Sequence, residues 1–221
     1  MTALPPFDAI LLDMDGLLLD SESTYCEAWR LAAAELGHRL EPDFLESLFG
    51  RHADDVVSAL SAALGPAFRR DVFFRAAEAV WFRSVESAGI PCMPGARELL
   101  SWMKVQHRPY AVATNSDGPY ASYCLQQGGL AGEFPVVVTR DQVARGKPEP
   151  DVYLEAARRL SVRPQRCLVL EDSETGLQAA RAARACPVLV QRRADLRASM
   201  QHLASFTFPS LHALLAMLES A

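Results

Sequence analysis

The sequence predicts a doubly wound α/β fold, a parallel sheet with helices on both faces, that carries an inserted all-helical domain. Short, continuous apolar runs recur along the chain, as expected of strands buried on both faces of a parallel sheet. Helical patterns separate most of these runs, so strands and helices alternate. One long stretch shows helical patterns and no convincing strand. The apolar runs lie at residues 9–12, 110–113, 136–138, 167–170 and 187–190.

The purely helical stretch lies between the first and the second predicted strand. Its apolar residues recur with helical spacing in three segments, at residues 25–36, 56–64 and 72–81. Gly37 and Gly65 follow the first two segments, and glycine is a common helix stop. We therefore expect an α/β core formed by residues 1–20 and 93–221, and an inserted helical domain formed by residues 21–92.

Composition argues against several classes of partner. The 221 residues include 22 Lys and Arg against 27 Asp and Glu, which gives a net charge of −5. A mildly acidic chain lacks the broad basic surface that binds nucleic acid or an anionic membrane, so we expect neither partner. An anionic small molecule must then be held by local cations, helix N-termini or a bound metal. Nothing in the sequence demands more than a monomer.

The cysteines and the N-terminus favour the cytoplasm. The five cysteines are odd in number and no two have C-x-x-C spacing, which favours reduced thiols over disulfides or a zinc site. The first residues show no secretory signal pattern, and no apolar run approaches the roughly 20 residues of a membrane span.

Polar side chains follow four of the five predicted strands. In open α/β sheets, ligands bind beyond the carboxyl ends of the strands, so these side chains are candidates for a site. The candidates are Asp13, Asp15, Thr114, Asn115, Lys147, Glu171 and Asp172.

This combination of groups suits phosphoryl transfer. Converging carboxylates repel one another unless a cation joins them, and Mg²⁺ prefers oxygen ligands of this kind. A carboxylate such as Asp13 can act as a nucleophile and form an aspartyl-phosphate. Thr114, Asn115 and Lys147 offer the donors and the positive charge that a transferring phosphoryl group requires. Asp15 can protonate the leaving oxygen and then activate water.

Each group also has an ordinary structural explanation. A D-x-D pair is often a turn, and Ser116 could cap the next helix. Lys147 could be an exposed loop lysine, and Glu171 with Asp172 could be a charged helix start. Their occurrence together, in order and at strand ends, favours a site.

The same residues resemble the motifs of the haloacid dehalogenase (HAD) superfamily, in its branch of capped phosphatases and β-phosphoglucomutase. The resemblance spans nearly the whole chain and implies a Rossmann-like core with a helical cap. The four matching motifs are residues 13–22 (DMDGLLLDSE), 112–116 (VATNS), 146–151 (GKPEPD) and 170–173 (LEDS).

The resemblance implies a role for each candidate. Asp13 would be the nucleophile and Asp15 the general acid and base, with Lys147 stabilising charge. Thr114 and Asn115 would bind the phosphoryl group. Mg²⁺ would be held by Asp13, the backbone carbonyl of Asp15, Asp172, and Glu171 either directly or through water. Simple dehalogenases of the superfamily lack a second aspartate and need no metal, so Asp15 and Asp172 speak against that activity.

The inserted domain favours a phosphatase of a small phosphorylated metabolite over a phosphosugar mutase. The mutase has a cap histidine five residues after the aspartate that corresponds to Asp20, and here that position is Tyr25. The mutase also has a K-G-x-S-R pattern, whereas residues 48–52 read LFGRH. Arg51 is a candidate for contacting substrate, with a surface arginine as the alternative.

Two other classes stay open at this point. A receiver-type signalling domain also uses an aspartate, a threonine and a lysine on a doubly wound sheet. Such domains are shorter, carry adjacent acidic residues and have no helical insert. A binding-only relative is a further option, although every expected catalytic position is filled. The sequence does not name the substrate: hexose phosphates, sugar-acid phosphates and nucleotides all fit.

Overall fold

A computed structural model of the chain describes residues 4–48, 53–65 and 68–220. It divides the chain into two compact units, one formed by Met1–Leu19 with Pro91–Ala221 and the other by Asp20–Ile90. These boundaries lie one and two residues from those expected from the sequence pattern. No helix among the described residues is long and apolar enough to cross a membrane.

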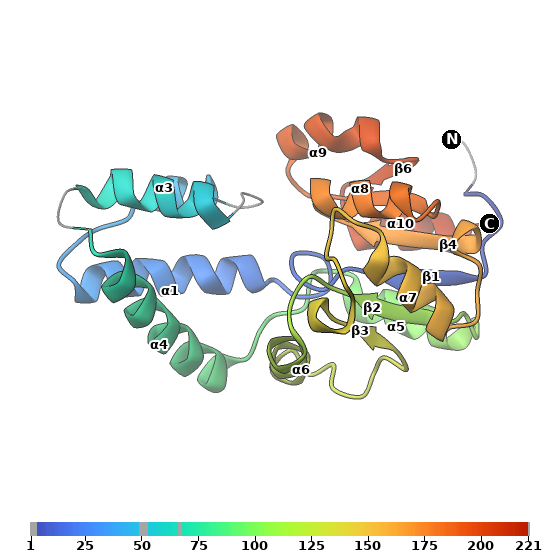
Figure 1. Cartoon of the computed structure of the whole chain (residues 1–221), viewed down its shortest axis with the longest axis horizontal. Coiled ribbons are helices and arrows are strands. Elements are labelled where there is room, and N and C mark those ends of the chain that lie inside the picture. The colour runs from blue at the N-terminus through green and yellow to red at the C-terminus, as the bar shows by residue number, and fades with distance from the viewer. Residues whose placement is uncertain (1–3, 49–52, 66–67, 221) are drawn as a thin grey trace. The chain divides into compact units, whose positions relative to one another are not determined.

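The larger unit is built on a six-stranded, all-parallel sheet with the strand order β3-β2-β1-β4-β5-β6 (Figure 1). The strands are β1 (Ala9–Leu12), β2 (Tyr110–Ala113), β3 (Val137–Val138), β4 (Cys167–Glu171), β5 (Cys186–Val190) and β6 (Phe206–Phe208). The predicted fold class is therefore confirmed. The sixth strand was not predicted, because only Phe208 of its three residues is buried.

Helices cover both faces of this sheet. They are α5 (Ala96–Val105), α6 (Gly118–Gln127), α7 (Asp151–Arg159), α8 (Glu174–Ala182), α9 (Ala194–Met200) and α10 (Leu211–Glu219). Helices α7 and α8 pack on one face, where Ala9, Leu11 and Val169 meet Ala156 and Ala179. Helix α5 lies on the other side of the sheet and packs against α10 (Figure 1).

The order of the strands fixes where the chain changes direction. After β1 the chain moves outward to β2 and β3, then returns to place β4 on the other side of β1. Leu12 of β1 pairs with Leu170 of β4, so the residues that follow them leave the sheet side by side. This switch point is the usual ligand position in doubly wound sheets.

The smaller unit is all-helical in its described part, as the sequence pattern predicts. It comprises α1 (Ser21–Glu35), α2 (Pro42–Glu46), α3 (Ala53–Leu64) and α4 (Arg70–Ala88). Helix α1 begins where Asp20 accepts a hydrogen bond from the Ser23 N–H. Helices α1 and α4 pack together through Tyr25, which stacks on Trp81 with ring centroids 5.0 Å apart.

Gly95 allows α5 to pack closely against the start of α10. Its φ is +91°, and a Cβ there would lie 2.8 Å from the backbone nitrogen of His212. Gly132 has a similar φ of +74°, and no atom lies within 4 Å of the place where its Cβ would be.

We expect Gly95→Ala to lower the unfolding free energy by about 2–4 kcal/mol, because steric overlap adds to backbone strain. Gly132→Ala, which adds backbone strain alone, should lower it by about 1 kcal/mol. Urea unfolding of the two variants measures the difference, and equal losses would contradict it.

Candidate active site

The candidate site begins at the carboxyl ends of β1 and β4. The N–H of Asp13, the first residue after β1, donates to the carbonyl oxygen of Leu170 at 3.1 Å. Glu171, the next residue of β4, therefore lies beside Asp13. Both side chains are buried, and the Glu171 residue is 0% exposed. Two neighbouring buried carboxylates require positive charge nearby.

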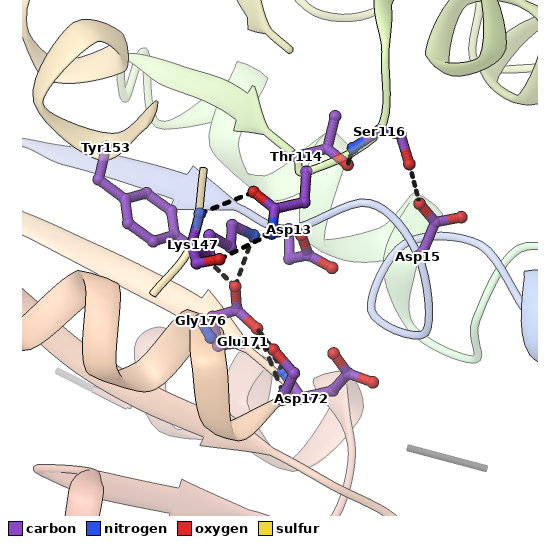
Figure 2. A network of polar contacts seen from close by, with 11 residues as sticks. Asp13, Asp15, Thr114, Ser116, Lys147, Tyr153, Glu171, Asp172 and Gly176 are labelled. Carbon is purple, nitrogen blue, oxygen red and sulfur yellow. Dashed lines mark hydrogen bonds and ion pairs between the residues drawn. The ribbon is translucent and has the colours of Figure 1, made fainter. Parts of the chain in front are cut away.

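Lys147 supplies that positive charge (Figure 2). Its Nζ forms an ion pair with Asp13 Oδ1 and a second one, 2.6 Å long, with Glu171 Oε1. The lysine side chain is itself 3% exposed. Its ammonium also lies 5.0 Å from the centre of the Tyr153 ring, a cation–π distance. One buried ammonium thus joins two carboxylates from neighbouring strands.

The buried cluster shifts the pKa of its members. Burial raises the pKa of Asp13 to about 7, the Lys147 ammonium opposes this effect, and the charges of Glu171 and Asp15 add to it. Burial acts to lower the pKa of Lys147, but the charges of Asp13 and Glu171 outweigh burial and raise that pKa above its usual range. Lys147 therefore stays charged at neutral pH.

Glu171 accepts hydrogen bonds on both of its oxygens. Oε1 accepts from the Tyr153 hydroxyl, in addition to Lys147. Oε2 accepts from the N–H of Asp172 at 3.2 Å and from both the N–H and the hydroxyl of Ser173, at 3.2 and 2.8 Å. These five donors satisfy the buried carboxylate of Glu171 without a direct bond to a metal.

Two features keep Glu171 in this arrangement. Burial, and then the charge of Glu171, raise the pKa of Tyr153 well above its usual value, so the phenol stays protonated and donates. Gly176 in α8 provides room, since a Cβ there would lie 1.8 Å from Glu171 Oε1.

The side chain of Asn115 holds the backbone of Lys147. Asn115 Oδ1 accepts from the Lys147 N–H at 2.7 Å, and its Nδ2 donates to the Lys147 carbonyl at 3.1 Å. The neighbouring Thr114 is buried, and its Oγ1 accepts from the Ser116 N–H at 3.0 Å. The Asn115 amide therefore positions the loop that carries Lys147.

Asp15 lies apart from the lysine cluster (Figure 2). It sits in a tight turn, where Gly16, with φ of +78°, donates its N–H to the Leu19 carbonyl at 2.8 Å. The Asp15 carboxylate accepts from the Ser116 hydroxyl at 2.8 Å and lies 3.5 Å from the Tyr120 hydroxyl. Ser116 is not the cap of α6, since Asp117 accepts from the Tyr120 N–H and caps that helix.

Three carboxylates could hold a metal ion. Asp13, Glu171 and Asp172 each offer an oxygen, and these oxygens lie within 4.8 Å of one another. An all-oxygen donor set fits a hard divalent cation such as Mg²⁺. Asp13 and Asp172 suit direct ligation best, because the oxygens of Glu171 already accept several hydrogen bonds. Gln191, just after β5, donates to the Asp172 carbonyl at 3.2 Å and steadies that residue.

The structure brings together most of the candidates named from the sequence. Asp13, Lys147, Glu171 and Asp172 form one cluster, Asn115 joins it through the Lys147 backbone, and Thr114 and Asp15 connect through Ser116. Arg51 lies outside the described residues. Sequence reasoning assigned no role to Tyr153, Tyr120 or Gln191. The one signal for Tyr153 is a hydroxyl-bearing aromatic side chain on the apolar face of α7.

A doubly wound sheet with a buried lysine–carboxylate cluster at its switch point has the arrangement of an enzyme site. The family model for haloacid dehalogenase-like hydrolases matches residues 7–184, and the chain belongs to this family.

Individual relatives are phosphatases by name. The chain is 35% identical over 182 residues to the fructose-1-phosphate phosphatase YqaB of Escherichia coli, with 80% of this chain and 93% of the relative covered. It is 34% identical over 176 residues to a phosphorylated carbohydrates phosphatase of Thermotoga maritima, with 80% and 81% covered. A Thermotoga maritima crystal structure, provisionally named a β-phosphoglucomutase, superposes with a TM-score of 0.81 at 29% identity and covers 97% and 100% of the two chains.

The buried ion cluster predicts a large stability effect at Lys147. We expect Lys147→Met to lower the unfolding free energy by about 3 kcal/mol in metal-free buffer, because Asp13 and Glu171 lose their buried counter-charge. Lys104→Met is a matched control, since the exposed Lys104 pairs with Glu133 at the surface and its loss should change little. Urea unfolding in the presence of a chelator measures both variants. A Lys147 variant as stable as the control would contradict the expectation.

Proposed function

We propose that this protein is a Mg²⁺-dependent phosphatase that hydrolyses a small phosphorylated carbohydrate or similar phosphomonoester through an aspartyl-phosphate on Asp13. The observation that carries the proposal is the buried Lys147 ammonium, which contacts Asp13 at the switch point of the sheet. A carboxylate nucleophile beside a fixed positive charge suits attack on a phosphate ester.

In the proposed first step, an oxygen of Asp13 attacks phosphorus. A bond forms between Asp13 and phosphorus while the ester P–O bond breaks, and Asp15 gives its proton to the leaving oxygen. Lys147 opposes the effect of burial on Asp13 and so favours the carboxylate needed for attack. The charge of Lys147 also balances the negative charge of the phosphoryl group.

In the second step, Asp15 acts as the base. It takes a proton from water, and the water oxygen attacks phosphorus. The bond to Asp13 breaks and inorganic phosphate leaves, which restores both carboxyl groups to their starting states. Thr114 and the backbone around Asn115 are proposed to bind the phosphoryl oxygens, while the Asn115 side chain holds the Lys147 loop.

The donor set fits Mg²⁺, and we propose that Asp13 and Asp172 bind it, together with the backbone carbonyl of Asp15. Glu171 would contribute through water, because its own oxygens accept hydrogen bonds from neighbouring donors. When bound, the cation neutralises phosphate charge that the protein alone leaves uncompensated.

We propose that the helical unit, Asp20–Ile90, acts as a cap that selects the substrate. Relatives named for fructose 1-phosphate, phosphorylated carbohydrates and hexitol phosphates support a carbohydrate phosphate as substrate. We propose that Arg51, in the same part of the sequence, contacts the substrate.

All five cysteines are free thiols, which supports a cytoplasmic protein. We propose that the protein acts as a monomer.

A phosphosugar mutase is the second candidate. The superposition on a structure provisionally named a β-phosphoglucomutase favours it. Tyr25, at the position of the mutase histidine, favours the phosphatase. The two differ in the acceptor, which is water in the phosphatase and a sugar hydroxyl in the mutase.

Substitution of the proposed nucleophile tests the reaction. We expect Asp13→Asn to lower phosphate release from an aryl phosphate and from hexose and hexitol phosphates by at least about 1,000-fold, because no aspartyl-phosphate can form. Asp195→Asn, at an exposed aspartate of α9, should retain activity. Equal activity of the Asp13 variant and the unsubstituted protein would refute the mechanism. Conversion of β-glucose 1-phosphate to glucose 6-phosphate faster than phosphate release would identify a mutase.

The metal proposal predicts a binding defect that is independent of turnover. We expect Asp172→Asn to weaken Mg²⁺ binding by about 10-fold or more, measured by isothermal titration calorimetry, because an amide oxygen carries no net charge. Glu174→Gln removes an exposed carboxylate two residues away and should leave the affinity unchanged. Loss of affinity in the control alone would place the metal elsewhere.

A further inference from the structure

The carboxylate of Asp15 is held by two hydroxyl groups that the proposed mechanism has not used. Ser116 Oγ donates to Oδ2 at 2.8 Å, a full hydrogen bond. The Tyr120 hydroxyl lies 3.5 Å from Oδ1, at the outer limit of hydrogen bonding. Figure 2 shows the Asp15 side chain turned toward Ser116, apart from the cluster of Lys147 and Glu171.

The backbone on each side of this contact is fixed. Asp15 forms a β-bridge with Leu19, which closes the turn that carries it. The Ser116 N–H donates to Thr114 Oγ1 at 3.0 Å, and the Ser116 carbonyl accepts from the Arg140 N–H at 2.9 Å. With both backbones held, the hydrogen bond from Ser116 sets the rotation of the Asp15 carboxylate.

Tyr120 is held in the first turn of α6. Its N–H donates to Asp117, the cap of that helix, at 2.9 Å. Its hydroxyl also acts to lower the pKa of the buried Cys124 thiol, one turn further along. The phenol is therefore held near Oδ1 of Asp15, whereas Ser116 contacts Oδ2.

We propose that Ser116, assisted by Tyr120, is a positioning residue that holds the Asp15 carboxyl where it exchanges a proton with the leaving-group oxygen. The inference rests on the proposed function, since it concerns the proposed general acid. Ser116 donates to Oδ2 of Asp15, and we propose that Oδ1, near Tyr120, carries the proton. Small displacements of a catalytic group cost up to about 100-fold in rate, so one hydroxyl has a measurable effect.

The dependence on the leaving group separates positioning of the acid from other roles. A good leaving group such as 2,4-dinitrophenolate departs without a proton, whereas the alkoxide of a sugar or hexitol requires one. We expect Ser116→Ala to lower kcat/KM by about 10–100-fold for hexitol or hexose phosphates and by less than about 3-fold for 2,4-dinitrophenyl phosphate. Tyr120→Phe should show the same pattern with a smaller loss, as its contact is longer.

Two control variants show whether loss of a hydroxyl group elsewhere in the α/β unit affects activity. Ser199→Ala removes a hydroxyl whose described contact is a hydrogen bond to the Leu196 carbonyl within α9. Tyr110→Phe removes a hydrogen bond to the Glu133 carbonyl, at the end of β2 that is remote from Ser116. Neither should change kcat/KM for either substrate. Circular dichroism and the urea midpoint establish that all variants are folded.

A double-substitution cycle completes the test. In an Asp15→Asn background, Ser116→Ala should cost less than about 3-fold with hexitol phosphates, because the acid that Ser116 positions is already gone. A Ser116→Ala loss of equal size for both leaving groups, or one that persists in the Asp15→Asn background, would overturn the inference. If the unsubstituted protein hydrolyses neither ester, the proposed function itself fails, and the inference fails with it.

Discussion

The site depends on one buried ammonium between two buried carboxylates. Removing three charges from water is costly, and it is tolerated only when opposite charges meet and the remaining polar atoms are hydrogen-bonded. Lys147 meets this requirement with Asp13 on one side and Glu171 on the other. Glu171 is further satisfied by Tyr153 and by the start of α8. Lys147 thus stabilises the charge of both carboxylates, and they stabilise the charge of Lys147, so no single member could be buried alone.

This cluster follows from the order of strands in a parallel sheet. Because β4 returns to pair with β1, the end of β1 and the end of β4 become neighbours although about 160 residues separate them. The lysine arrives from the loop after β3, and Asn115 at the end of β2 fixes that loop with two hydrogen bonds. Gly176 leaves the space that Glu171 fills. Four strand ends therefore build one site from short, local segments.

The sequence was most informative where burial is complete. Strands β1, β2 and β5, and β4 as far as Leu170, are apolar without interruption because both faces are covered, so they could be recognised directly. Strand β6 lies at the edge of the sheet, where Thr207 is exposed, and its short pattern resembles a loop. Side chains directly after strands were likewise predictable from position. The partners Tyr153 and Tyr120 were not, because their hydrogen bonds join segments that only the folded chain brings together.

Asp13 and Asp15 show how two aspartates two residues apart acquire different environments. Asp13 directly follows β1 and its carboxylate contacts Lys147, whereas Asp15 begins the turn closed by its bridge to Leu19 and its carboxylate contacts the hydroxyls of Ser116 and Tyr120. Burial raises the pKa of Asp13, and the adjacent ammonium opposes that effect, whereas Asp15 faces neutral hydroxyl donors. In the proposed mechanism, attack on phosphorus and proton transfer therefore fall to two carboxyl groups that lie in separate surroundings. The pattern Asp-x-Asp acquires this meaning because its first residue directly follows a strand and its second begins a turn.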